Sequence, residues 1–88
     1  MELQTSTQFR RDTTLLRRRG RDMGKMRVVV DRLLAEQELD PSNRLHRLTG
    51  NWAGHWECHI EPNWLLVWRQ YEDVIFLQRT GSHSDIFG

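Results

Sequence analysis

The spacing of the apolar positions changes near the middle of the chain. Up to about residue 38, apolar side chains recur every three or four positions, which is the spacing of one face of an α-helix. From about residue 52 onwards, apolar and polar residues alternate or form short apolar runs, as is typical of β-strands. The pattern therefore predicts an α+β protein in which the helices precede most of the strands.

We expect two helices that form a hairpin. Residues 2–5 are suited to a short strand, after which a serine or threonine at positions 5–7 can cap a first helix that ends at Gly20. A second helix is expected from about Asp22 to Glu38. Its apolar stripe consists of Met26, Val29, Val30, Leu33 and Leu34.

The second half predicts three strands in an antiparallel meander. They are expected at 52–60, 64–68 and 74–79, separated by turns that contain Pro62 and Asp73. In the first of these strands, alternation places one set of side chains toward the core and the opposite set outward. The inward set is Trp56, Cys58 and Ile60, and the outward set is His55, Glu57 and His59. The helix hairpin is expected to pack on one face of this small, mainly antiparallel sheet.

The size and composition indicate one domain that spans residues 1–88. A chain of 88 residues fits one hydrophobic core, and 38% hydrophobic residues with 28% charged residues are typical of a globular protein. The single cysteine, Cys58, excludes an internal disulfide and favours a reducing compartment. The sequence has no run of eighteen apolar residues and no apolar signal segment, so we expect a cytoplasmic protein.

The net charge of +1 hides a strong asymmetry along the chain. Up to Arg32 there are nine basic and four acidic residues, whereas the remainder has four basic and eight acidic residues. The basic part predicts attraction of a polyanion, although each arginine alone is equally consistent with a solvated helix face. The run from Arg17 to Arg21 favours the polyanion, because crowded like charges cost stability.

Three of the four histidines lie between His55 and Phe87, which makes this segment a candidate site for proton transfer. His55, Glu57 and His59 are also a possible metal triplet, but spacing along one strand converges poorly, and exposed strand polarity is the favoured interpretation. We expect Cys58 to serve in packing. We expect no metal and no cofactor.

The C-terminal segment allows two interpretations. Arg79 and His83 flank Gly81, so the arginine can hold a phosphate while the histidine transfers a proton. Alternatively, the tail caps the sheet by packing Ile86 and Phe87, and leaves His83 merely exposed. Spacing alone does not separate the two. The fourth histidine, His46, lies in a basic loop and by itself is typical of a surface residue. Three tryptophans are most simply core residues, with stacking on a base as the alternative for any one of them; these are Trp52, Trp64 and Trp68.

The ordered residues 45–54, 57–67 and 79–87 resemble the YafQ branch of the RelE-like toxins of bacterial type II toxin–antitoxin systems. Phe9, Asp12, the Gly20–Asp22 corner and the Leu33-Leu34 helix end agree as well, so that the resemblance covers nearly the whole chain. It implies a RelE-like fold with a short first strand, two helices and a β-meander.

The resemblance also implies a metal-independent mRNA interferase that acts in the ribosomal A site and inhibits translation. A ribose 2′-OH attacks the adjacent phosphate in that chemistry, which requires a base, an acid and cations around the phosphate. Among the implied catalytic positions, His83 is the candidate acid and His59 the candidate base. His46 positions substrate or shares proton transfer, and the roles of these three histidines are interchangeable. The catalytic set is His46, His59, Asn63, His83 and Phe87, and the substrate-binding set is Trp64, Arg79, Arg44 and Arg47.

The chain departs from the family pattern at two positions. Asn63 stands where the pattern has aspartate, and Trp56 stands where these toxins often carry arginine. An amide cannot take a proton as a carboxylate does. These departures motivate an alternative function, a catalytically weakened toxin-fold protein that mainly binds its antitoxin.

The expected partners follow from the same resemblance. They are the ribosome with its mRNA, and a small cognate antitoxin with an acidic segment and a DNA-binding N-terminal part. Operator DNA is expected only indirectly, through a toxin–antitoxin complex that can be a heterotetramer. No membrane partner is expected.

Overall fold

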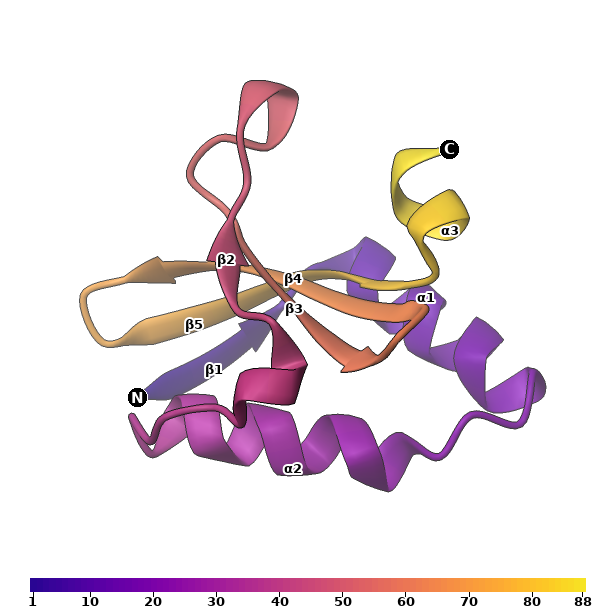
Figure 1. The fold of residues 1–88 in the computed structure, drawn as a ribbon, viewed down its shortest axis with the longest axis horizontal. Coiled ribbons are helices and arrows are strands. Elements are labelled where there is room, and N and C mark those ends of the chain that lie inside the picture. Colours follow the sequence, from indigo (N-terminus) through magenta and orange to yellow (C-terminus); the bar gives the residue numbers. More distant parts are fainter.

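A five-stranded mixed sheet separates two layers of helix in the computed structural model, which describes residues 1–88 (Figure 1). The order across the sheet is β1-β5-β4-β3-β2, and only the β1–β5 pair is parallel. The α+β expectation with a mainly antiparallel sheet is thereby confirmed. The strands are β1 (Glu2–Thr5), β2 (His46–Arg47), β3 (Trp56–Glu61), β4 (Trp64–Tyr71) and β5 (Val74–Gly81).

The two long helices, α1 (Thr7–Arg18) and α2 (Met23–Leu34), cover one face of the sheet. Each begins at a side-chain cap: the Ser6 hydroxyl accepts a hydrogen bond from the Phe9 amide, and the Asp22 carboxylate accepts one from the Gly24 amide. Burying apolar area is the main stabilising contribution of this layer. The main core consists of Phe9, Val29, Val30, Cys58, Leu66, Trp68, Ile75 and Leu77.

Both helices end in the same backbone motif, but with different residues. After α1, the Gly20 and Arg21 amides donate to the carbonyls of Arg17 and Leu16, with Gly20 at φ 79°. After α2, the same pair of bonds places Glu36 at φ 56°. The prediction that the second helix continues to Glu38 is therefore wrong, since α2 ends at Leu34. No glycine signals this end in the sequence, because Glu36 takes the left-handed position.

A smaller layer covers the opposite face of the sheet. It contains the C-terminal helix α3 (His83–Phe87) and the 3₁₀ turn η2 (Gly50–Trp52), whereas η1 (Pro41–Asn43) precedes β2 (Figure 1). Leu65, Val67 and Ile86 are buried there against Leu48, Trp52 and Phe87. None of the helices has the length and apolar composition needed to cross a bilayer.

Several boundaries differ from the sequence prediction in this second half. β3 begins at Trp56 rather than at residue 52, because residues 50–52 form a 3₁₀ turn and Gly54 has φ 90°. β4 and β5 extend to Tyr71 and Gly81. The pattern did not predict β2 and α3, which have two and five residues.

Candidate active site

The face of the sheet opposite the helix hairpin carries a histidine–carboxylate pair. His46 in β2 lies directly across from Glu57 in β3, and its Nε2 is 3.1 Å from Glu57 Oε2. The Nδ1 atom of His46 is 2.8 Å from the carbonyl oxygen of Arg44, which has φ 49°. Because both partner atoms accept hydrogen bonds, a doubly protonated His46 ring can donate from both nitrogens.

Glu57 was expected to be an exposed polar residue, and this prediction is wrong. Glu57 is only 5% exposed, and the His46 ring is its side-chain partner. The second layer over this face covers positions that simple alternation assigns to solvent. A carboxylate this buried requires a hydrogen-bonding or charged partner.

His59 lies beside this pair with one ring nitrogen free. The ring centroids of His46 and His59 are 6.4 Å apart, and His59 Nδ1 is 3.2 Å from the Pro62 carbonyl oxygen. The carbonyl can only accept, so Nδ1 carries a proton and the neutral ring leaves Nε2 as a proton acceptor. The backbone of His59 is fixed as well, since the Asn43 side-chain amide donates to its carbonyl at 2.8 Å.

A hollow of about 360 Å³ opens next to the His59 ring. Its lining includes Arg44, whose guanidinium makes no hydrogen bond or ion pair within the chain, and it also includes Glu61. A space of this size is at the lower end of ordinary ligand pockets. The remaining lining residues are Ser42, Ile60 and Pro62.

His83 is the first residue of α3 and is exposed. Its backbone amide donates to the side-chain oxygen of Asn63 at 3.4 Å, which joins α3 to the β3–β4 turn. Its ring packs against Phe87 at 5.0 Å between centroids, and Phe87 in turn packs edge-on against Trp52 at 5.5 Å. The imidazole nitrogens of His83 make no hydrogen bond within the chain, so both are available to a ligand.

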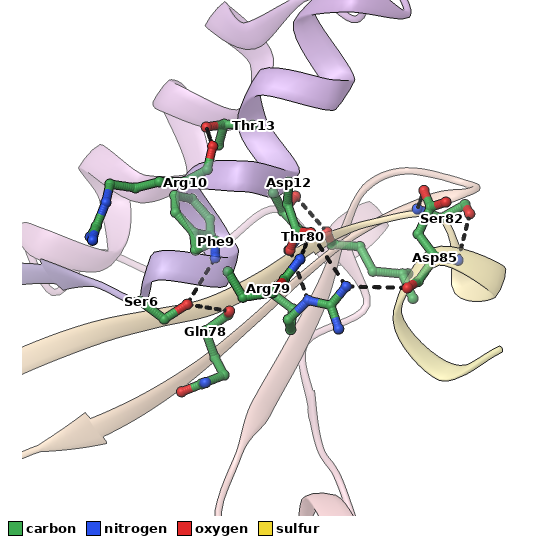
Figure 2. A network of polar contacts seen from close by, with 12 residues as sticks. Ser6, Phe9, Arg10, Asp12, Thr13, Gln78, Arg79, Thr80, Ser82 and Asp85 are labelled. Carbon is green, nitrogen blue, oxygen red and sulfur yellow. Dashed lines mark hydrogen bonds and ion pairs between the residues drawn. The ribbon is translucent and has the colours of Figure 1, made fainter.

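Arg79 lies in a network that joins α1, β5 and α3 (Figure 2). Its Nε donates to Asp12 at 2.8 Å, and one Nη atom donates to the Asp85 carbonyl at 3.2 Å. Asp12 also accepts from the Thr80 amide, which lies on the part of β5 beyond the end of β1. The Asp12 carboxylate therefore provides hydrogen-bond acceptors both for the Thr80 amide at the sheet edge and for the half-buried Arg79 guanidinium.

Two predicted substrate-binding residues lie elsewhere. Trp64 is fully buried, and its indole N–H donates to the Thr80 hydroxyl at 2.8 Å, so it has no ring face for a base. Arg47 lies over the Trp56 ring at 4.6 Å, and the alternation along β2 places it on the opposite face from His46. The geometry therefore separates Trp64 and Arg47 from the three histidines.

The structure brings no three histidine, cysteine or acidic side chains together in a metal-binding arrangement. His55 precedes β3, and its Nδ1 is 3.1 Å from the Trp52 carbonyl. Cys58 is fully buried, and burial raises the pKa of its thiol to about 12, so it is not a nucleophile at neutral pH. Packing is thus the role its position supports.

Sequence reasoning missed two parts of this site. It did not identify Glu57 as a buried carboxylate, although its position two residues before His59 on the same face was visible in the sequence. It also missed the anchor of α3, Asp85. The Ser82-x-x-Asp85 spacing is a helix-start signal that could have revealed the helix.

Known proteins share this fold over its full length. The family model described as the bacterial toxin of type II toxin–antitoxin system, YafQ, matches residues 1–88. The mRNA interferase toxin YafQ of Escherichia coli strain K12 is 30% identical over 88 residues, which cover 99% of this chain and 96% of the relative.

Solved structures agree with this match. Crystalline YafQ from E. coli BL21(DE3) has a TM-score of 0.95 at 28% identity, with 99% of this chain and 98% of that chain covered. YafQ in the E. coli DinJ–YafQ complex has a TM-score of 0.92 at 30% identity, with the same coverage. A metal-bound toxin from Helicobacter pylori has a TM-score of 0.93 at 37% identity, with 99% of both chains covered. The chain thus belongs to the YafQ toxin family of bacterial type II toxin–antitoxin systems.

Proposed function

We propose that this toxin is an mRNA interferase that cuts messages inside the ribosomal A site and thereby inhibits translation. The observation that carries the proposal is the placement of His46 and His59 on the sheet face opposite the helix hairpin and of His83 in the layer over that face, with ring nitrogens of His59 and His83 open to a ligand. The curated E. coli relative is named an mRNA interferase.

The chemistry needs no metal. A base removes the proton of a ribose 2′-OH, the 2′-oxygen attacks the adjacent phosphorus, and the bond from phosphorus to the 5′-oxygen breaks. An acid gives its proton to that 5′-oxygen, so the products are a 2′,3′-cyclic phosphate and a 5′-OH. We assign the base to His59, whose Nε2 is free, and the acid to His83; His46 shares proton transfer or positions substrate.

The surrounding residues support these three. Glu57 holds His46 through a 3.1 Å contact, and a protonated His46 adds a positive charge near the reacting phosphate. Asn63 holds the start of α3 through the His83 amide, and Phe87 orients the His83 ring. Arg44 lines the hollow beside His59 with an unpaired guanidinium, which is suited to a phosphate of the message.

Arg79, Trp64 and Arg47 take indirect roles in this proposal. Arg79 is bound to Asp12 and to the Asp85 carbonyl, so its main contribution is to the position of α3. Trp64 supports β5 through Thr80. Arg47 lies on the other face and adds only to the positive field that attracts RNA.

Expression in bacteria tests the proposal. Induction should arrest growth, and primer extension should map new mRNA ends inside translated codons but none in untranslated RNA. His59→Ala and His83→Ala should each relieve the arrest, whereas His55→Gln, at a histidine outside the site, should retain it. The proposed site is wrong if both alanine variants still arrest growth while folding normally.

We also propose that this protein acts in the cytoplasm and binds a cognate antitoxin. The antitoxin proposal is supported by the E. coli neighbour, which was solved as a DinJ–YafQ toxin–antitoxin complex. The acidic segment of the antitoxin would bind the basic helices, and the complex, as a heterotetramer, would contact operator DNA through the antitoxin.

The second candidate is a binding protein with little catalysis. It is favoured by Asn63, whose amide accepts the hydrogen bond from His83 but cannot transfer a proton at neutral pH. In that case the product of a neighbouring acidic reading frame should co-purify with this chain while induced cells show no new mRNA ends.

A further inference from the structure

The helix that carries His83 is too short to hold itself in place. α3 has five residues, and isolated helices of that length are unstable in water. Its apolar anchors are the buried Ile86 and the partly exposed Phe87. Polar contacts must therefore fix its orientation.

Most of those polar contacts converge on Asp85 (Figure 2). Its carboxylate accepts from the Ser82 amide at 2.9 Å, while the Ser82 hydroxyl accepts from the Asp85 amide at 3.1 Å. Its backbone carbonyl accepts from Arg79. A Cβ on Gly81, which has φ 153°, would lie 3.0 Å from the same carboxylate, so the chain leaves room for Asp85 there.

Arg19, from the helix-hairpin layer, makes a further contact to Asp85. It follows the last turn of α1, and its two Nη atoms reach the two Asp85 carboxylate oxygens at 2.7 and 3.3 Å. Exposed ion pairs usually contribute little, but a two-pronged contact to a carboxylate already fixed by a helix cap loses less side-chain entropy. The adjacent Arg17 and Arg18 make no ion pair or side-chain hydrogen bond within the chain.

Basic residues where α1 connects to α2 also hold the β3–β4 turn, which contacts the His83 amide. Arg21 and Lys25 bind the two carboxylate oxygens of Glu61 at 2.7 and 2.6 Å, just before the turn that carries Asn63. Asn63 in turn accepts from the His83 amide. The basic residues between the end of α1 and the start of α2 thus hold both α3 and the β3–β4 turn, the two elements that meet at His83.

We infer that Arg19 is a positioning residue for His83, acting through Asp85, and that it does so apart from any attraction between the arginine run and RNA. The inference rests on the proposed function, because positioning matters to catalysis only if His83 transfers a proton. Small displacements of a reacting group are costly, so kcat is the quantity that should respond.

Arg18 provides a matched control for the experiment. Arg18→Met and Arg19→Met each remove one positive charge from the same run, so both should raise the KM for programmed ribosomes to a similar extent. Only Arg19→Met should also lower kcat, by about tenfold. Arg19→Lys keeps one charged contact to Asp85 and should recover most of that loss, which a purely structural role for the side-chain volume would not explain.

Amide hydrogen exchange gives a readout that does not depend on activity. The Ile86 amide donates to the Ser82 carbonyl at 3.2 Å inside α3. Its exchange should be about tenfold faster in Arg19→Met than in Arg18→Met, with the amides of β4 unchanged. Asp85→Asn keeps an oxygen for the Ser82 amide but removes the charge that Arg19 binds. In this background, adding Arg19→Met should change neither kcat nor the exchange rate of the Ile86 amide any further.

The outcomes distinguish the positioning role of Arg19 from the catalytic role of His83. Equal kcat and equal Ile86 exchange in the two methionine variants would overturn the positioning role. If Ile86 exchange rises only in Arg19→Met but His83→Ala leaves cleavage intact, Arg19 still positions α3, and the proposed catalytic role of His83 fails. If His83→Ala abolishes cleavage while Arg19→Met matches Arg18→Met in kcat, the proposed function stands and the inference about Arg19 is wrong.

Discussion

Glu57 shows at the scale of single residues what one sequence can and cannot indicate. The histidines and Asn63 were identifiable because their chemistry and the family resemblance coincide at those positions. Glu57 was assigned to solvent because alternation distinguishes two faces of a strand but not whether the second face is covered. Burial of Trp64 agrees with the core role expected from its residue type, whereas the ion pair of Arg79 with Asp12 depends on contacts between distant segments.

The first prediction concerns Glu57. Glu57→Gln keeps the side-chain shape but removes the charge that faces His46 at 3.1 Å. We expect mRNA cleavage to fall at least about tenfold, because His46 loses the partner that orients it. Single-turnover cleavage on programmed ribosomes measures this. Glu72→Gln, an exposed control, should be unaffected, and equal rates in the two variants would contradict the role of Glu57.

The second prediction concerns Asn63. Asn63→Asp places a carboxylate where the amide now accepts from the His83 backbone at 3.4 Å. A carboxylate orients a protonated histidine better and can itself take a proton, so we expect cleavage to rise by about tenfold. The same single-turnover assay applies. An unchanged rate would show that the amide is no impairment in this protein.

At the scale of elements, the boundaries that were predicted well are those with a chemical signal. Gly20 marks the end of α1, and Asp22 caps α2. The end of α2 was missed because Glu36 occupies the position that glycine usually takes. β2 and α3 were missed because two and five residues are too few for a periodic pattern, and long-range contacts hold them.

The third prediction follows from Glu36. A residue other than glycine at φ 56° is strained, so Glu36→Gly should stabilise the protein by about 0.5–1 kcal/mol in spite of the added entropy of the unfolded chain. Urea unfolding followed by tryptophan fluorescence measures the change. Glu38→Gly, at a position whose backbone is not left-handed, should not raise the free energy of unfolding. A loss of stability in Glu36→Gly would show that the strain at this helix end is negligible.

At the scale of the whole molecule, charge links the two layers around the sheet. The basic first part of the chain was evident from the sequence, but its pairing with particular acids was not. Arg19 binds Asp85, whereas Arg21 and Lys25 bind Glu61. The asymmetry that suggested an external polyanion therefore also serves to join the helix hairpin to the site.

The fourth prediction is a loss of stability in acid. The hydrogen bond from Arg19, together with the one from the Ser82 amide, lowers the pKa of Asp85 from its usual 3.8 to about 2. A carboxyl with a lowered pKa contributes its full stabilisation above about pH 4, and that contribution disappears as the pH falls through about 2. Asp85→Asn should therefore flatten the fall in unfolding free energy between pH 4 and 2 by about 1–2 kcal/mol. Parallel pH curves for the two proteins would contradict this linkage.

The proposal that three histidines cleave RNA without a metal is tested most directly by the chemistry of the cut ends. Purified toxin should be incubated with ribosomes that carry a defined message, and the new termini analysed by mass spectrometry. We expect a 2′,3′-cyclic phosphate, or the 3′-phosphate formed from it, opposite a 5′-OH, with none of these ends produced by His83→Ala. Termini with a 3′-OH and a 5′-phosphate would contradict it, because attack by water in place of the 2′-OH would then make the cut.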